Sequence, residues 1–393
     1  MELTRREFAG LLVTIGAAGA VASITGCSGS GSSAAGSTST ASASASTIVG
    51  TLSADGTERT LTDDAGRTVT VPAEIDKIYC AIPTSEAMAV TLAPEKLVGW
   101  VNQPSDAMLK YLPASMASLP VLGGWMGQQV TANMEAIINA NPDVILYSYG
   151  SNSTDTDVST YAQYADQIAS DSGKPCIVFD GNLNKLADNY RWLGQVIGVQ
   201  ERSEKLAAYV EEKLAAVAEA VAKVPASEIV TCYYAEGQGG LATDQSGSTH
   251  TQVIDFCNVK NVAVVDGFAG AKGQGMIEVS MESVIGWNPQ VILVSGSTPA
   301  NYASIKDGDS WKDIQAVKDG KIYQTPIIPF GWFDRPPNAT RVLGCQWFAG
   351  LIYPKYYTAD VREDIKDYFD LFYNVNITDA EIDTILSPNP VLA

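Results

Sequence analysis

The sequence predicts an α/β fold in which two similar α/β lobes are joined by one long helix. Three observations predict it: one segment occurs twice, strand patterns alternate with helix patterns, and a long amphipathic helix pattern lies between the two copies of the segment. Such alternation is typical of mostly parallel sheets with right-handed crossovers. At 393 residues the chain is also long for one core, since domains commonly have about 100 to 200 residues.

The repeated segment occupies residues 133–146 and returns at residues 280–293, with Met, Glu, Ile, Asn-Pro and Val-Ile-Leu in register. Each copy predicts a short helix, a stop at Pro142 or Pro289, and then a buried strand. The stop is expected because the residue before a proline is disfavoured in the α region. The short apolar run after it suits a strand that is covered on both faces. The copies are too far apart for a solenoid, so they indicate two similar lobes.

The joining helix is predicted over residues 200–224, where apolar side chains recur every three or four positions and Pro225 ends the pattern. It would be about 35 Å long, the width of a small domain. We therefore expect an N-terminal lobe over residues 58–199 and a C-terminal lobe over residues 225–393. A single joining helix would limit closure of the lobes.

Smaller elements follow the same alternation. Residues 58–71 predict a hairpin that turns at residues 63–66, and residues 185–198 and 339–386 predict further helices. Strands are predicted at residues 77–82, 96–100, 121–122, 144–147, 176–179, 229–234, 262–265, 291–294 and 321–324.

The first 27 residues predict an export signal. A charged start with Arg5 and Arg6 precedes an apolar run and small residues, and the paired arginines resemble a twin-arginine signal. The residues that end at Cys27 resemble a bacterial lipoprotein cleavage site, in which the cysteine is acylated; an uncleaved membrane anchor is the alternative. Either way we expect a protein held at the outer face of the cytoplasmic membrane. The Ser-, Ala-, Gly- and Thr-rich residues 28–57 predict a flexible tether.

The composition excludes several classes of function. A net charge of −19 argues against nucleic acid, which requires basic stripes. The single histidine, His250, excludes sites that need several imidazoles. Besides Cys27 the chain has five cysteines and no CxxC motif. We therefore expect buried free thiols rather than a disulfide framework or a metal site.

Several segments carry a resemblance to a known family. They are the hairpin at residues 62–72, the Thr84-Ser85-Glu86 turn, both glutamate-containing repeats, and residues 331–337 with Gly344, Trp347 and Tyr353-Pro354. Together they resemble the iron–siderophore and cobalamin class of substrate-binding proteins that feed ABC importers. The resemblance implies two lobes bridged by one helix, a ligand cleft between the lobes, and an ABC permease with its ATPase as partners. It implies binding without catalytic residues.

The resemblance also implies a role for Glu135 and Glu282, which occupy the same position in the two repeats. In this family the glutamate of each lobe faces the membrane and pairs with arginines of the permease. From the residues alone, two matched anions suit a pseudo-symmetric partner. The alternative is that each glutamate only stabilises the positive end of its helix, by about 0.3–1 kcal/mol.

Ligand-binding residues are predicted in the loops at the carboxyl ends of the strands, because ligands of open α/β sheets bind there and pockets favour domain interfaces. The candidates are Trp125, Met126 and Tyr149 in the first lobe and Gln238, His250, Trp332, Phe333 and Arg335 in the second.

The aromatic candidates Trp125, Tyr149, Trp332 and Phe333 would supply flat walls for a large planar or catechol-bearing chelate. The alternative is that they belong to the lobe cores. Glycines directly before Trp125 and Trp332 favour exposed loop tips.

The charged candidates suggest two kinds of ligand. Arg335 would pair with an anionic ligand through its planar guanidinium, or else with Asp334 or a helix end. His250 would serve as an axial ligand of haem or as a metal ligand of a chelate, or else is an ordinary polar residue.

The sequence therefore predicts a lipid-anchored binding protein, not an enzyme, that captures a metal chelate such as a ferric siderophore and has no resident cofactor. Molybdate or tungstate, cobalamin and haem remain alternative ligands. A cofactor-binding enzyme on the same two lobes is a distant alternative, opposed by the single histidine and the export signal.

Overall fold

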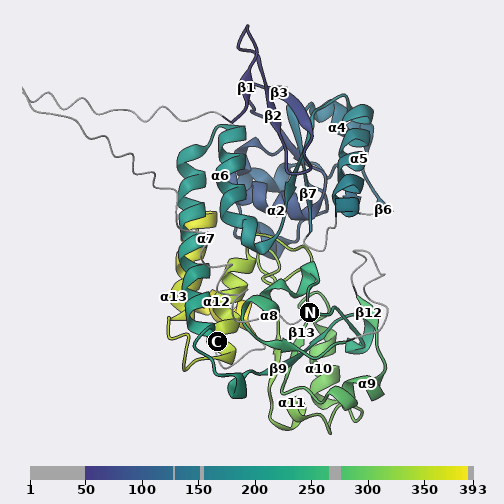
Figure 1. Cartoon of the computed structure of the whole chain (residues 1–393), viewed down its shortest axis with the longest axis vertical. Coiled ribbons are helices and arrows are strands. Elements are labelled where there is room, and N and C mark those ends of the chain that lie inside the picture. Colours follow the sequence, from purple (N-terminus) through teal and green to yellow (C-terminus); the bar gives the residue numbers. More distant parts are fainter. Residues whose placement is uncertain (1–48, 127–128, 151–154, 265–275, 388–393) are drawn as a thin grey trace, which may run out of the picture. The chain divides into compact units, whose positions relative to one another are not determined.

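A computed structural model of the chain describes residues 49–126, 129–150, 155–264 and 276–387 (Figure 1). The predicted signal, Cys27 and most of the predicted tether lie outside the described residues. No helix in the described ranges combines the length and the apolar character needed to cross a membrane.

The first lobe is built on a three-stranded parallel sheet in the order β4-β7-β8. The strands are β4 (Ile78–Cys80), β7 (Val144–Tyr149) and β8 (Cys176–Asp180), and their side chains are buried almost throughout. The helices of this lobe are α2 (Pro83–Leu92), α3 (Asp106–Leu109), α4 (Met134–Ala140), α5 (Asp155–Ser172) and α6 (Leu186–Ile197). A short antiparallel pair is formed by β5 (Trp125–Met126) and β6 (Gln129–Val130).

The predicted hairpin is confirmed, but the predicted tether extends too far along the chain. β2 (Glu58–Thr62) pairs with β3 (Thr68–Pro72), but β1 (Thr51–Leu52) adds a third antiparallel strand beside β2. The ordered chain therefore begins before residue 58. Composition misled the prediction, because backbone pairing at a sheet edge does not need large apolar side chains.

The second lobe is built on a four-stranded parallel sheet in the order β11-β9-β13-β14. Its strands are β9 (Thr231–Ala235), β11 (Lys260–Asn261), β13 (Val291–Val294) and β14 (Ile322–Gln324), and β10 (Ala242–Thr243) pairs separately with β12 (Ile277–Glu278). Its helices are α8 (Gln252–Phe256), α9 (Met281–Trp287), α10 (Ala300–Asp307), α11 (Gln315–Lys318), α12 (Arg341–Ile352), α13 (Val361–Tyr373) and α14 (Asp379–Leu386).

Three predicted strands differ from the structure; the one expected at residues 121–122 is only an isolated bridge, at Val121. The strand expected at residues 262–265 is β11, two residues earlier, although Val262 N still donates to Cys232 O at 2.9 Å. Residues 96–100 form only isolated bridges, at Leu97 and Trp100. All three segments are short enough that the apolar pattern alone does not set their limits.

The repeated segment folds as predicted in both lobes. Asn133 and Ser280 cap α4 and α9 by accepting hydrogen bonds from backbone N–H groups in the first turn. Asn141 and Asn288 end the helices in the left-handed region, with φ of 52° and 40°. One sequence pattern therefore gives the same helix-stop-strand unit twice.

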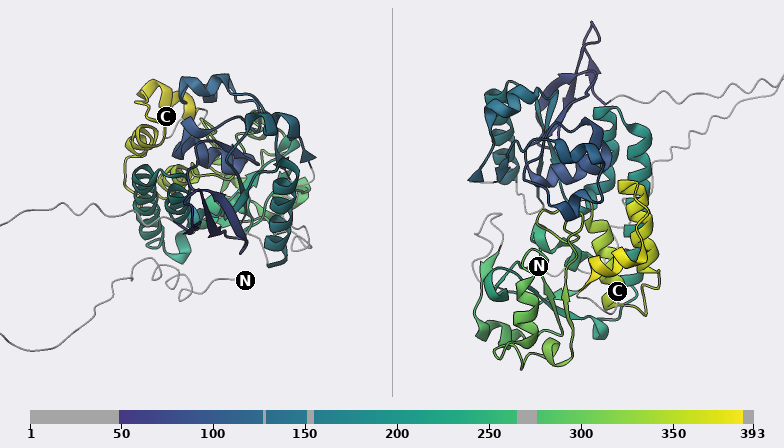
Figure 2. Two further views of the ribbon diagram at one scale, coloured as in Figure 1. Left: turned by 90° about the horizontal axis from the view of Figure 1, so that it is seen from above. Right: turned by 180° about the vertical axis from the view of Figure 1, so that it is seen from behind.

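The joining helix is α7 (Gln200–Val221), and its predicted apolar stripe is buried. It packs against α6 of the first lobe and α12 of the second, and Figures 1 and 2 show it beside both. Alternate strand residues of both sheets, such as Leu146 and Leu293, face one hydrophobic core that surrounds this helix. The intervening residues, such as Ile145 and Ile292, face separate cores under α5 and α10. The lobes thus share one core on the side of α7.

Hydrogen bonds also join the lobes directly. Arg341 of α12 is fully buried; it donates to Gly181 O at 2.5 Å in the first lobe and to Asn338 O at 2.9 Å in the second. Gln252 of α8 accepts from Arg341 and, at 3.0 Å, from Leu183 N. We call this contact, formed by residues 181–183 with Gln252 and Arg341, the seam.

Candidate ligand-binding site

Charged side chains gather at the carboxyl end of β9 in the second lobe. Glu236 follows β9 directly, Asp244 follows β10, and His250 lies in the 3-10 turn η6 (Thr249–Thr251). Asp334 and Arg335 come from the loop after β14. We call these five residues the acidic cluster. The carboxyl ends of parallel strands are where α/β sheets bind ligands, so the cluster lies where a ligand is expected.

One guanidinium faces three carboxylates in the acidic cluster. Arg335 Nε lies 2.7 Å from Glu236 Oε1 and 3.3 Å from Asp334 Oδ2, and Arg335 Nη2 lies 2.8 Å from Asp244 Oδ2. The carboxylates are buried, while the Arg335 side chain is 24% exposed. Among the described residues, none accepts a hydrogen bond from Nη1 of Arg335. The arginine is therefore held from one side and remains partly accessible.

Within the acidic cluster, His250 lies beside Asp334. Its Nδ1 is 3.1 Å from Asp334 Oδ2, although neither atom makes a hydrogen bond within the described chain. The other oxygen of Asp334 accepts from the Tyr234 hydroxyl at 2.6 Å. Ser248 orients the turn by accepting from His250 N and donating to Asp244 Oδ1 at 3.0 Å. The imidazole is thus fixed next to two buried aspartates.

Burial and neighbouring charge shift the pKa values in the acidic cluster. Burial, together with the charge of Asp334, raises the pKa of Glu236, and the guanidinium of Arg335 offsets part of that rise. Burial lowers the pKa of Arg335, but the charges of Asp334 and Glu236 outweigh that effect and raise it. Burial raises the pKa of Tyr234, which therefore stays a hydrogen-bond donor. The cluster keeps an anionic character around one fixed cation.

The acidic cluster lies next to the first lobe. A Cβ built on Gly150, just past β7, would come within 2.5 Å of Thr249 Oγ1, so η6 touches the loop that ends this strand. Gln252, two residues after His250, belongs to the seam. The cluster therefore borders the contact between the carboxyl ends of the two sheets.

The first-lobe candidates are only partly accessible. Trp125 lies in β5, is half-buried, and meets Tyr79 edge-on with ring centroids 6.4 Å apart. Tyr149 is the last residue of β7 and stacks on Tyr161 at 5.5 Å. Met126 belongs to β5, but its side chain lies outside what the structure describes. The ligand-binding role of these residues stays a prediction.

The expected exposure of Trp332 and Phe333 is wrong. Their exposed fractions are 0% and 1%, and both lie in the core around α7. Trp332 Nε1 donates to Ile328 O at 2.9 Å, and Phe333 meets Trp347 edge-on at 5.6 Å. The glycine before them allows close packing rather than an exposed tip, because a Cβ on Gly331 would lie 2.3 Å from Asp334 O. In this structure neither ring offers a surface to a ligand.

The remaining second-lobe candidate, Gln238, is exposed at the start of the 3-10 turn η5 (Gln238–Gly240). The sequence selects Gln238 in this loop, but it does not single out Glu236 or Asp244. The available signal was a lone carboxylate directly after the apolar strand β9. Asp334 was considered only as a partner of Arg335.

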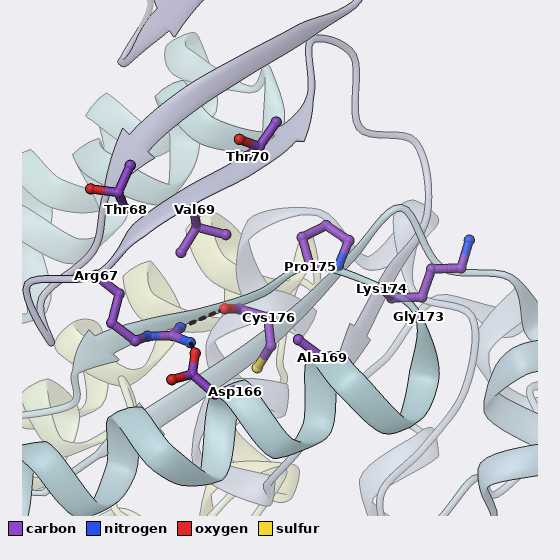
Figure 3. Close-up of a pocket in the computed structure, with 10 residues that line it drawn as sticks. All are labelled: Arg67, Thr68, Val69, Thr70, Asp166, Ala169, Gly173, Lys174, Pro175 and Cys176. Carbon is purple, nitrogen blue, oxygen red and sulfur yellow. Dashed lines mark hydrogen bonds and ion pairs between the residues drawn. The ribbon is translucent and has the colours of Figure 1, made fainter.

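Other features of the described chain do not point to a ligand. A shallow pocket between β3, α5 and the turn before β8 contains Arg67, which is already paired with Asp166 at 2.7 Å and with Cys176 O at 2.6 Å (Figure 3). Cys176 opens β8, so this pocket lies at the amino edge of the sheet. All five cysteines of the described residues are buried and free, as expected.

The two repeat glutamates are exposed. Glu135 and Glu282 stand in the first turns of α4 and α9, and in the described chain neither lies within ion-pair distance of a lysine or arginine. Helices α4 and α9 both lie on the side away from α7 in Figure 1. Both carboxylates are thus free to meet a partner.

Glu86, in the first turn of α2, gives the stability of the first lobe a testable pH dependence. It is 5% exposed and accepts from Val101 N at 2.5 Å, and burial raises its pKa to about 8. The pKa in the folded protein exceeds the value of 4.5 of a free glutamate, so stability falls as pH rises from about 4.5 to about 8. Glu86→Gln keeps the acceptor and removes the titration. We expect it to be more stable than the wild type by roughly 2–4 kcal/mol at about pH 9 and nearly equal at about pH 5, in urea unfolding. An equal stability difference at both pH values would contradict this assignment.

Comparisons with known proteins agree with this architecture. A family model described as "Periplasmic binding protein" matches residues 125–328, more than half of the chain. The molybdate-binding protein MolA of Haemophilus influenzae is 26% identical over 351 residues, which cover 81% of this chain and 92% of MolA. YvrC of Bacillus subtilis, an uncharacterized ABC transporter substrate-binding lipoprotein, is 19% identical over 67% of this chain and 77% of its own length.

Solved structures show the same fold. An ABC transporter solute-binding protein of Sulfurospirillum deleyianum matches with a TM-score of 0.73 and 28% identity, covering 83% of this chain and 98% of that one. MolA bound to molybdate matches with a TM-score of 0.64 and 22% identity over 81% and 99% of the two chains, a likeness of fold alone. The chain belongs to the periplasmic binding protein family, whose members are substrate-binding components of ABC transporters.

Proposed function

We propose that the protein captures a metal species outside the cytoplasmic membrane and delivers it to an ABC permease, and that the acidic cluster is where the ligand is recognised. The observation that supports this most directly is the position of His250. The only imidazole of the chain stands beside two buried aspartates, at the carboxyl edge of the second-lobe sheet. Imidazole nitrogens and carboxylate oxygens are ordinary ligands of metal ions. A metal chelate with open coordination positions, such as a ferric siderophore, is our first candidate.

A molybdate or tungstate oxyanion is the second candidate. Arg335 supports it, because its partly exposed guanidinium keeps Nη1 free of described acceptors and suits a tetrahedral anion. The relative MolA, named as a molybdate-binding protein, supports it as well. The surrounding carboxylates oppose it, since three of them face the one arginine.

The ligand can be identified in protein purified from its native membranes. We expect bound metal near one per chain by elemental analysis, with visible charge-transfer bands if the cargo is a ferric chelate. Colourless protein that contains molybdenum or tungsten would select the oxyanion, and a Soret band would select haem. Protein that carries no metal under metal-replete growth would contradict the proposal.

We further propose that Glu135 and Glu282 dock onto the permease. Both are exposed and free of described ion-pair partners, and the repeat places one at the start of α4 and one at the start of α9. Two matched carboxylates suit two arginine-bearing subunits or halves of a permease.

The double variant Glu135→Ala/Glu282→Ala tests this docking. We expect cellular uptake of the cargo to fall by at least tenfold while ligand affinity in solution stays unchanged, because the glutamates lie outside the acidic cluster. Glu212→Ala is the matched control, since Glu212 is an exposed acid on α7 without a described ion pair. Normal uptake by the double variant would rule out the docking role.

We propose a lipid anchor at Cys27, reached through the twin-arginine route that the start of the chain resembles. Cys27→Ser should move the protein from the membrane fraction to the soluble extracytoplasmic fraction on cell fractionation. If the variant stays in the membrane, an uncleaved apolar anchor holds the protein instead.

A further inference from the structure

The acidic cluster holds three atoms in an arrangement that a metal ion would accept. One ligand atom each from Asp244, His250 and Asp334 lie within 4.8 Å of one another. The closest pair, His250 Nδ1 and Asp334 Oδ2, is 3.1 Å apart. Ligand atoms that share a cation at about 2.1 Å are roughly 3 Å apart, so only a small closure is needed.

Three buried polar atoms of the acidic cluster have unsatisfied hydrogen-bonding capacity. Glu236 Oε2, Asp334 Oδ2 and His250 Nδ1 are buried and make no hydrogen bond in the described chain. Glu236 and Asp334 are at least nine-tenths buried. Buried polar atoms nearly always have a partner, because an unpaired one costs about 1–3 kcal/mol. Two of these three atoms, His250 Nδ1 and Asp334 Oδ2, are in contact at 3.1 Å.

The balance of hydrogen-bond donors and acceptors also favours a cation. Three carboxylates surround a single guanidinium, and Arg335 uses Nε and Nη2 without satisfying all of their oxygens. The cluster therefore has more acceptors than its one arginine can satisfy.

We propose that Asp244, His250 and Asp334 bind a divalent transition-metal cation through one oxygen of each aspartate and one imidazole nitrogen. The inference rests on the proposed function, because the cation would be the cargo or the exposed metal centre of a small chelate. Two carboxylates and one imidazole form a mixed O,N donor set that suits zinc, nickel, cobalt or ferrous iron better than calcium or magnesium.

In the absence of a metal ion, Arg335 supplies the positive charge next to these aspartates. It contacts the oxygens that the metal would use, since its Nη2 is 2.8 Å from Asp244 Oδ2 and its Nε is 3.3 Å from Asp334 Oδ2. The side chain is 24% exposed, so it has a route outward when a metal enters. Metal and guanidinium compete for the same aspartates, so removal of the arginine should strengthen metal binding. An oxyanion would require the opposite, because the guanidinium would be its main partner.

The experiment is a titration of tag-free, metal-free protein with Zn²⁺, Ni²⁺, Co²⁺ and, separately, molybdate, followed by calorimetry. We expect one divalent cation per chain. Asp244→Asn, His250→Gln and Asp334→Asn should each weaken it by roughly tenfold or more. Arg335→Gln should strengthen it by a similar factor, and Glu212→Ala should leave it unchanged.

A spectroscopic readout on the wild type avoids any folding defect of the variants. Because His250 is the only histidine of the chain, nitrogen hyperfine coupling from an imidazole on bound Cu²⁺ can arise only from this residue. Absence of stoichiometric cation binding, or molybdate binding that is lost in Arg335→Gln, would overturn the metal site. If a variant loses uptake but still binds the cation, the metal site stands. If the wild type binds the cation but cells never import it, only the proposed function is contradicted.

Discussion

The seam is the constraint on which the rest of the structure depends. Arg341 is fully buried and has backbone and amide oxygens, rather than a carboxylate, as its hydrogen-bond acceptors. Burial lowers its pKa to about 10, so it remains a cation. A buried charge is costly unless its hydrogen bonds are satisfied, and Gly181, Gln252 and Asn338 satisfy them together only when the lobes meet as they do here. The contact fixes η6, and with it His250, beside the first-lobe loop that ends at Gly150.

The shared core around α7 explains how such a seam can persist. Leu146 of the first lobe and Leu293 of the second belong to the same continuous set of buried side chains. Opening the lobes widely would have to expose part of that set to water, at about 25 cal/mol for each Å² of apolar surface. We therefore expect small adjustments at the acidic cluster rather than a hinge motion of whole lobes. A site of this kind depends on side chains that move locally, such as the partly exposed Arg335.

The fold could be predicted from the sequence because its signals are local. The repeat carries its own caps, Asn133 and Ser280, and its own stops at Asn141 and Asn288, so each unit is specified within fourteen residues. The apolar stripe of α7 is equally local. The exposure of Trp332 was not predictable in this way, since it depends on α12, whose Gly344 lets the two backbones approach. The edge strand β1 was missed because its pairing with β2 leaves no apolar pattern.

The candidate site could be predicted only as a set of loops. Glu236 and Asp244 lie 99 and 91 residues before Arg335, and the sheet order brings them to this arginine and to Asp334 beside it. Sequence reasoning selected His250 and Arg335 because each is chemically distinctive. It could not count the carboxylates around them, and that count decides between a cation and an anion.

A crystal structure of the protein purified with its native cargo tests the account most directly. The account predicts ligand density against the acidic cluster, in contact with His250 or Arg335 and bordered by the first-lobe loops that follow β7 and β8. Density in the pocket beside Arg67, or anywhere remote from the seam, would contradict it.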